Sequence, residues 1–175
     1  NRERRSSHVL DVLVNVPLIV PTAALGISLS LFWGSAGSLG ELELIILILA
    51  HVAFTYPLVV RNVAGAVEEI DPSYEETART LGASPTQSFR RVLYPLIKGS
   101  ILAGAIMAFT RSLGETGATQ AILGNDAPTA PVFIVSLVRS DAFFQAGLAC
   151  IVLIIVSYVF MLMLRYLTKK RKEAI

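Results

Sequence analysis

The sequence predicts an all-α membrane protein, a polytopic bundle of transmembrane helices, from its composition, its apolar runs and the placement of its basic residues. Hydrophobic residues make up 54% of the 175 residues and charged residues 16%, with a mean hydropathy of +0.64. A soluble domain carries about 25% charged residues. The chain is therefore expected to form a single transmembrane domain over residues 1–175.

Four apolar stretches are long enough to cross a bilayer, whose core of about 30 Å needs roughly 20 residues of helix. They cover about residues 9–33, 42–60, 96–113 and 142–167. Pro17 and Pro21 lie in the first stretch, so a kink or break is expected near its start. The chain begins at Asn1 rather than Met, and we expect one or two further spans to precede it.

The basic residues indicate how these spans are oriented, because cytoplasmic loops carry an excess of Lys and Arg. If both termini are cytoplasmic, all but Arg111 and Arg139 of the 15 Lys and Arg residues fall in the N-terminus, the 61–98 connection or the C-terminus. The opposite orientation would place nearly all of them on the wrong side. Both termini are therefore expected in the cytoplasm.

The 61–98 connection begins with the signals of a short helix. Residues 73–76 read Ser-Tyr-Glu-Glu, which predicts a capping box. In it the Ser73 hydroxyl accepts from the backbone N–H of Glu76, and the Glu76 carboxylate accepts from the backbone N–H of Ser73. Gly82 is suited to end this helix in the left-handed conformation.

A second short helix is predicted directly afterwards, because residues 84–87 read Ser-Pro-Thr-Gln and repeat the start signal. Pro95 is expected to end it near Leu93. Each helix has one apolar face, made by Tyr74, Ala78 and Leu81 in the first and by Phe89, Val92 and Leu93 in the second. Two interpretations stay open: an interfacial loop whose charges are solvated, or an apolar ridge that docks in the groove of a cytoplasmic partner.

The spacing in this connection resembles the EAA loop of binding-protein-dependent ABC permeases. That family reads Glu-Ala-Ala, three residues, Gly, nine residues and then Ile-x-Leu-Pro, and every spacing is met here, with departures at Thr77, Val92 and Tyr94. The resemblance implies that residues 68–95 insert into a cleft of an ATPase subunit and carry its motion into the membrane. The positions implied in this coupling are Glu76, Thr77, Ala78, Gly82, Val92 and Pro95.

The same resemblance implies a prokaryotic inner-membrane protein that works as a homodimer with two cytoplasmic ABC ATPase subunits and an extracytoplasmic solute-binding protein. The sequence contains no Gly-x-x-x-x-Gly-Lys-Ser/Thr, so ATP and Mg²⁺ are expected in the partner ATPase, and no cofactor is expected in this chain. No Cys or His cluster has metal-ligand spacing, and neither a metal site nor a nucleic-acid partner is expected.

Residues 112–119, Ser-Leu-Gly-Glu-Thr-Gly-Ala-Thr, resemble the signature of permeases for molybdate, tungstate and sulfate, which commonly read Leu-Gly-Glu-Phe-Gly-Ala-Thr. Arg111 lies four residues before Glu115, so the two share a helix face and predict an ion pair. A purely structural pair and a gate or pathway role both stay open. The resemblance implies an extracellular gate formed in part by Gly114, Glu115, Thr116 and Gly117.

The predicted function is therefore the membrane subunit of an ATP-driven importer for a small oxyanion, with molybdate or tungstate ahead of sulfate or thiosulfate. Iron, phosphonate, polyamine and thiamine importers share the loop and stay open as substrates. A membrane-embedded enzyme would draw on His51, Glu115 and Asp11, but no nucleophile–base spacing supports one, so the chain is not expected to be an enzyme. A channel or scaffold that works without ATP would have no use for a coupling loop.

Overall fold

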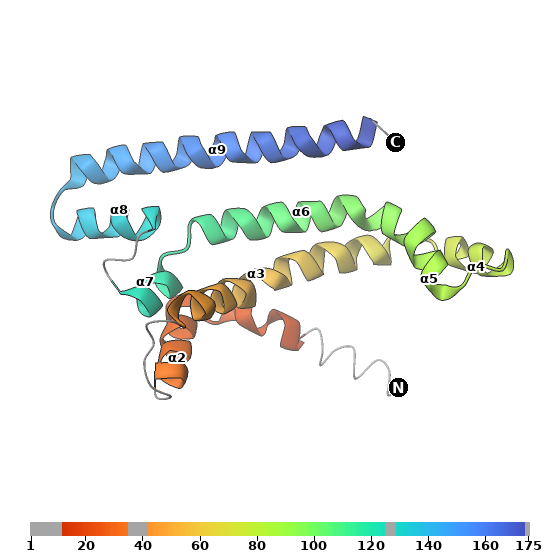
Figure 1. The fold of residues 1–175 in the computed structure, drawn as a ribbon, viewed down its shortest axis with the longest axis horizontal. Coiled ribbons are helices and arrows are strands. Elements are labelled where there is room, and N and C mark those ends of the chain that lie inside the picture. Colours follow the sequence, from red (N-terminus) through yellow and green to blue (C-terminus); the bar gives the residue numbers. More distant parts are fainter. Residues whose placement is uncertain (1–11, 35–41, 125–128, 174–175) are drawn as a thin grey trace. The chain divides into compact units, whose positions relative to one another are not determined.

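The computed structural model describes residues 12–34, 42–124 and 129–173, and all regular structure in these ranges is helical (Figure 1). The prediction of an all-α protein is confirmed. A helix over Val12–Ile19 is followed by α2 (Thr22–Gly34), α3 (Glu43–Glu68), α4 (Ser73–Thr80), α5 (Pro85–Ser88), the π-helix η1 (Phe89–Leu93), α6 (Tyr94–Leu113), α7 (Gly117–Leu123), α8 (Ala130–Arg139) and α9 (Phe143–Glu173).

Three of the described helices are long and apolar enough to cross a membrane. They run over Glu43–Glu68, Pro85–Leu113 and Phe143–Tyr166. The helices Val12–Ile19 and Thr22–Trp33 add a fourth span if the pair is counted as one. The chain is therefore a multi-pass membrane protein.

The first predicted span is two helices rather than one. The helices Val12–Ile19 and Thr22–Trp33 meet at an angle of 100°. Pro21 lies at the break and has no N–H to donate, and it also disfavours helical backbone at Val20. The expected kink is thus a sharp corner, and residues 9–11 of the predicted span, including Asp11, lie outside the described residues.

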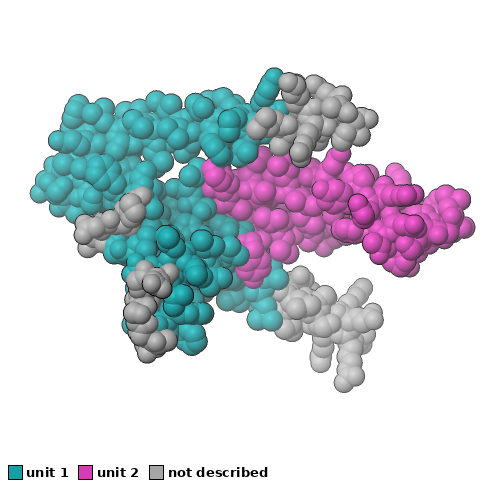
Figure 2. Space-filling view, viewed as in Figure 1, with its two compact units in different colours: residues 1–55, 110–175 teal, residues 56–109 magenta. Residues whose placement is uncertain are grey.

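The chain contains two compact units, residues 1–55 with 110–175 and residues 56–109 (Figure 2). In the first unit, α3 and α7 share a buried apolar core. Its buried members are Ile46, Ala50 and Phe54 from α3 and Ala118 and Ile122 from α7. The short helix α7 is therefore held by core packing, which also fixes the segment that leads into it.

Helix α2 packs on α7 at very short range. A Cβ atom added at Gly26 would lie 2.9 Å from the Cα and carbonyl oxygen of Ala118 and from the Cβ of Ala121. Ser30 Oγ also donates to the carbonyl oxygen of Ala121 at 3.3 Å. Small residues at these positions let the two backbones approach, as is common between membrane helices.

In the second unit, the C-terminal part of α3 packs on α6 through another glycine. A Cβ atom added at Gly104 would lie 2.7 Å from the Cα of Val59. Asn62 Nδ2 donates to the carbonyl oxygen of Leu58 at 2.8 Å and contacts Met107 Sδ at 3.3 Å. α3 runs to Glu68 rather than ending near Val60, because no proline follows Val60 before Pro72.

Helix α4 begins one step earlier than its predicted capping box. The Ser73 side chain makes no capping bond. Instead, Asp71 Oδ1 accepts a hydrogen bond from the Ser73 backbone N–H at 2.9 Å, and Pro72 occupies the first turn. This bond to the charged form lowers the pKa of Asp71 below its ordinary value. The cap is therefore present above the usual carboxylate pKa and is lost as the pH falls through the lowered pKa.

The end of α4 and the start of α5 follow the prediction. Gly82 has a φ of +85°, its N–H donates to the carbonyl of Arg79 at 2.9 Å, and the Ala83 N–H donates to the carbonyl of Ala78 at 3.0 Å. These two bonds form a Schellman motif. The Ser84–Gln87 capping box is also confirmed, with both reciprocal hydrogen bonds present.

Pro95 does not end the second helix, contrary to the prediction. A continuous helix runs over Pro85–Leu113, so the helix that contains the third predicted span begins well before Leu96. The π-turn at Phe89–Leu93 explains this, because the Tyr94 N–H donates to the carbonyl of Phe89. The wider turn shifts the hydrogen-bond register just before Pro95, where an α-helix would lose a bond and meet a steric clash.

Candidate functional site

A bend between α6 and α7 contains the residues predicted for the gate. α6 ends at Leu113 and α7 begins at Gly117, so the helix does not continue to Leu123. The bend carries Glu115, whose exposed fraction is only 4%. A buried carboxylate needs partners that compensate its charge.

Glu115 has partners from three directions. Its Oε1 accepts from the backbone N–H of Ala118 in α7 at 3.0 Å, and its Oε2 accepts from Arg111 Nη1 of α6 at 2.5 Å. The hydroxyl of Thr22, the first residue of α2, also bonds to the carboxylate. The predicted Arg111–Glu115 ion pair is therefore present, and one side chain ties together the ends of three helices.

Arg111 is the more exposed member of the pair. Its side chain is 43% exposed, against 3% for Glu115. The guanidinium carbon lies 5.0 Å from the centre of the Phe54 ring, a cation–π arrangement. Arg111 therefore has one partner in the ion pair and one in the core of the unit.

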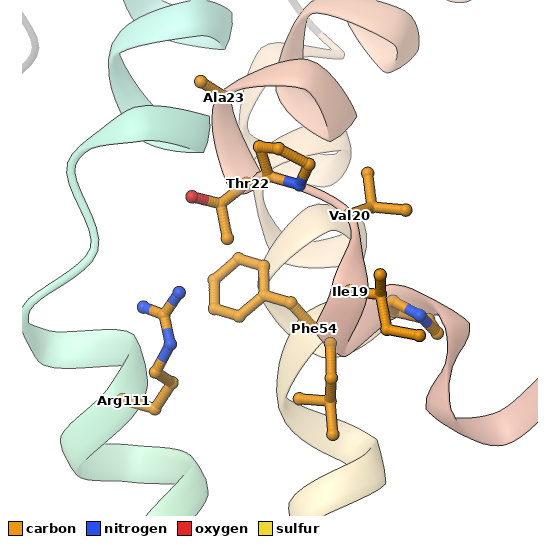
Figure 3. Close-up of a pocket in the computed structure, with 9 residues that line it drawn as sticks. Ile19, Val20, Thr22, Ala23, Phe54 and Arg111 are labelled. Carbon is orange, nitrogen blue, oxygen red and sulfur yellow. The ribbon is translucent and has the colours of Figure 1, made fainter.

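A cavity of about 400 Å³ lies against Arg111 at the corner of the broken helix (Figure 3). In the figure, the guanidinium points toward Thr22 and the Phe54 ring. The lining residues are Pro17, Leu18, Ile19, Val20, Pro21, Thr22, Ala23, Phe54 and Arg111. Among the described residues, Arg111 is thus the only charged one that lines the cavity.

His51 of α3 connects the two sides of the bend. Its Nδ1 lies 2.7 Å from Ser112 Oγ in α6, and its Nε2 lies 3.2 Å from Thr119 Oγ1 in α7. The ring also packs against Phe54, with centroids 5.0 Å apart. In the sequence His51 stands out only as a possible group of a membrane-embedded enzyme, and nothing in the spacing links it to hydroxyls 61 and 68 residues away.

The remaining predicted gate residues form the backbone of the bend. Thr116 precedes α7 and makes no capping bond through its side chain. A Cβ atom at Gly117 would lie 3.1 Å from the Ala23 N and from Thr22 Oγ1, so this glycine allows α2 to approach. Gly114 has open space around it. The bend is therefore tightly packed on its α7 side.

The residues predicted for coupling lie in the second unit, on α4, on η1, in the turn after α4 and in the first turn of α6. Glu76, Thr77, Gly82 and Pro95 are exposed, while Ala78 and Val92 are half-buried. Glu75 and Arg79 form an exposed ion pair at 2.6 Å, which contributes little to stability.

The predicted apolar faces of the two loop helices are largely open. Leu81 is 83% exposed, and Tyr74 and Phe89 are also exposed. A smaller cavity of about 190 Å³ lies beside them, lined in part by Tyr74, Ser88 and Val92. A large apolar side chain exposed at a helix end is the kind of feature that a partner's groove covers.

These features define a polytopic helical membrane protein with an exposed apolar loop. The described residues contain no group of three His, Cys, Asp or Glu side chains that could hold a metal ion. The chain belongs to the family described as the binding-protein-dependent transport system inner membrane component, whose profile matches residues 1–173.

Individual relatives are permease proteins of two kinds of transport system. The chain is 40% identical to the sulfate transport system permease protein CysT of Salmonella typhimurium over 127 residues, 67% of this chain and 46% of that protein. It is 30% identical to the molybdenum transport system permease protein ModB of Escherichia coli over 181 residues, 94% of this chain and 79% of that protein. The match thus spans just under half the length of the sulfate permease.

Proposed function

We propose that this chain is the membrane-spanning subunit of an ATP-driven importer and forms the pathway for a small tetrahedral oxyanion. The observation that carries the proposal is the family match over residues 1–173, together with the loop of α4 and α5 that presents exposed apolar residues. The chain itself lacks the Gly-x-x-x-x-Gly-Lys-Ser/Thr motif of ATPases, so ATP hydrolysis is assigned to a separate partner subunit that binds ATP and Mg²⁺.

In this proposal the loop over residues 68–95 faces the cytoplasm, and both ends of the chain lie on the same side. The distribution of Lys and Arg supports this orientation. Two ATPase subunits would bind the loops of two permease copies, and a solute-binding protein would deliver the anion on the opposite side. Arg111, Gly114, Glu115, Thr116 and Gly117 would form part of the gate on that side.

The relatives favour two classes of oxyanion. Molybdate or tungstate agrees with a similarity that extends over 94% of this chain. Sulfate agrees with the higher identity of 40% over a shorter stretch. All three ions are tetrahedral dianions, so the same cationic and hydrogen-bonding groups would suit each of them.

The uptake assay that tests the function uses proteoliposomes with the complete transporter, including its ATPase and binding protein. ATP inside the vesicles is expected to drive uptake of radiolabelled molybdate or sulfate, and an excess of the correct unlabelled ion is expected to abolish it. Vesicles without ATP are the control. Failure of molybdate, tungstate and sulfate alike to be imported would overturn the oxyanion assignment, and uptake without ATP would favour a channel.

Replacing Leu81 by aspartate is expected to weaken binding of the ATPase by at least about tenfold, because a buried leucine contributes about 1.5–3 kcal/mol. The fold of the permease should be unaffected, since Leu81 is 83% exposed. Co-purification of the ATPase measures the effect. Leu81→Met keeps the apolar contact and should bind the ATPase as the unchanged protein does. Normal ATPase binding by Leu81→Asp would show that Leu81 is not part of the docking surface.

A further inference from the structure

Glu115 has two kinds of partner, and they belong to different parts of the bend. The Ala118 N–H and the Thr22 hydroxyl come from α7 and α2, which pack backbone to backbone at Gly26. Arg111 comes from α6, on the other side of Gly114. The carboxylate is therefore anchored to the α2–α7 pair even without Arg111.

Arg111, in contrast, is placed to exchange its partner. Its guanidinium carries several N–H donors, and the ion pair with Glu115 uses Nη1. The side chain is 43% exposed, and Arg111 also lines the cavity at the corner of the broken helix. A planar guanidinium binds oxyanions through paired hydrogen bonds, which a single carboxylate oxygen does not fully use.

The cavity is large enough to hold an anion, and Arg111 is placed in its lining to neutralise the anion's charge. Its volume of about 400 Å³ compares with about 30 Å³ for one water molecule in the liquid. A tetrahedral oxyanion with part of its hydration shell therefore fits. Of the described residues that line the cavity, all but Arg111 and Thr22 have apolar side chains, so the guanidinium is the only group among them that can neutralise an anionic charge.

We propose that this cavity is an oxyanion site in which the incoming anion displaces Glu115 from Arg111. The anion takes the guanidinium, and Glu115 keeps its bonds to Ala118 and Thr22. The displacement breaks the ion pair that joins α6 to the α2–α7 pair, so the cargo itself loosens the bend. This inference rests on the proposed oxyanion cargo. In it, Arg111 lets the gate region respond directly to the bound anion.

If this exchange occurs, Glu115 competes with the anion for the guanidinium of Arg111. Removing its charge should therefore tighten anion binding, whereas a plain structural ion pair predicts no such gain. Glu115→Gln retains an oxygen that can accept from the Ala118 N–H and has nearly the same shape. It is the variant that separates the two interpretations.

Equilibrium dialysis of the purified permease–ATPase complex, without nucleotide and without binding protein, tests the proposal with radiolabelled sulfate and molybdate as the probes. We expect Glu115→Gln to bind at least one of these anions about tenfold more tightly than the unchanged protein. Arg111→Gln should lose this binding, and Arg111→Lys should fall between them because an ammonium lacks the paired geometry. Anion sites on the ATPase are common to all samples and cancel in the differences.

Arg139→Gln is the matched control, because Arg139 is a basic residue of α8 that does not line the cavity. Its anion binding should equal that of the unchanged protein. Size-exclusion profiles and thermal unfolding show whether each variant is folded. If Arg111→Gln does not fold, the comparison of Glu115→Gln with Arg111→Lys still decides the question.

Two results would overturn the proposal: unchanged binding in Glu115→Gln, or retained binding in a folded Arg111→Gln. The assay needs neither ATP nor a binding protein, so its outcome is separate from that of the uptake assay. Tight, Arg111-dependent binding without uptake would contradict the proposed transport function alone. Normal uptake with no effect of either substitution on binding would contradict the exchange alone.

Discussion

Replacing Gly104 by alanine is expected to destabilise the protein by on the order of 1–3 kcal/mol, the range for overpacked sites. The added methyl group would lie 2.7 Å from the Cα of Val59. Because that contact is with backbone rather than with a flexible side chain, α3 and α6 would have to move apart. Unfolding of the purified permease by increasing fractions of denaturing detergent measures the loss.

Gly65→Ala is the matched control for this prediction. Gly65 also lies within α3, but nothing comes within 4 Å of a Cβ atom added there. Alanine is favoured over glycine inside a helix by about 0.5–1 kcal/mol, so this variant should be as stable as the unchanged protein or slightly more so. Equal stability of the two alanine variants would show that α3 and α6 do not pack closely at Gly104.

Gly82→Val is expected to reduce ATP-driven uptake by at least tenfold while leaving the permease in the membrane. Gly82 has a φ of +85°, where a β-branched residue is strained by about 1–2 kcal/mol or more. The strain would open the Schellman turn that sets α5 against α4. Uptake in proteoliposomes and ATP hydrolysis, measured together, would show import falling relative to ATP consumed.

The Gly82→Asn variant shows whether the loss of uptake comes from the backbone conformation at residue 82 or from the loss of glycine itself. Asn tolerates the left-handed conformation better than other residues, so Gly82→Asn should keep most of the uptake. Import by Gly82→Val at the rate of the unchanged protein would show that coupling does not require the rigid turn. It would also favour an ATP-independent channel, which has no need of such a turn.

Local sequence signals predicted the turn between α4 and α5 well, and they failed where two signals competed. The roles of Gly82 and of the Ser84–Gln87 capping box follow from backbone chemistry within a few residues. At the start of α4, Asp71 and Pro72 form an alternative start signal, and it prevails over Ser73. At Pro95 the general rule failed because a π-turn absorbs the missing hydrogen bond.

The candidate gate could be predicted only in part. Arg111 and Glu115 are four residues apart, so their pairing follows from helical spacing. Neither the Thr22 hydroxyl nor the His51 ring could be assigned to the same region, because each is far away in the chain. The cavity is likewise invisible in the sequence, since it depends on the 100° corner between two helices.

The residue order alone established the membrane class, the helical content and the local turn chemistry. Each depends on interactions within one helix or on the length of an apolar run against the thickness of a bilayer. Which helices touch, and that Glu115 joins the ends of α2, α6 and α7, emerged only in three dimensions. The physical reason is that side-chain contacts between distant segments arise from close packing at small residues such as Gly26, and no periodic pattern encodes those contacts.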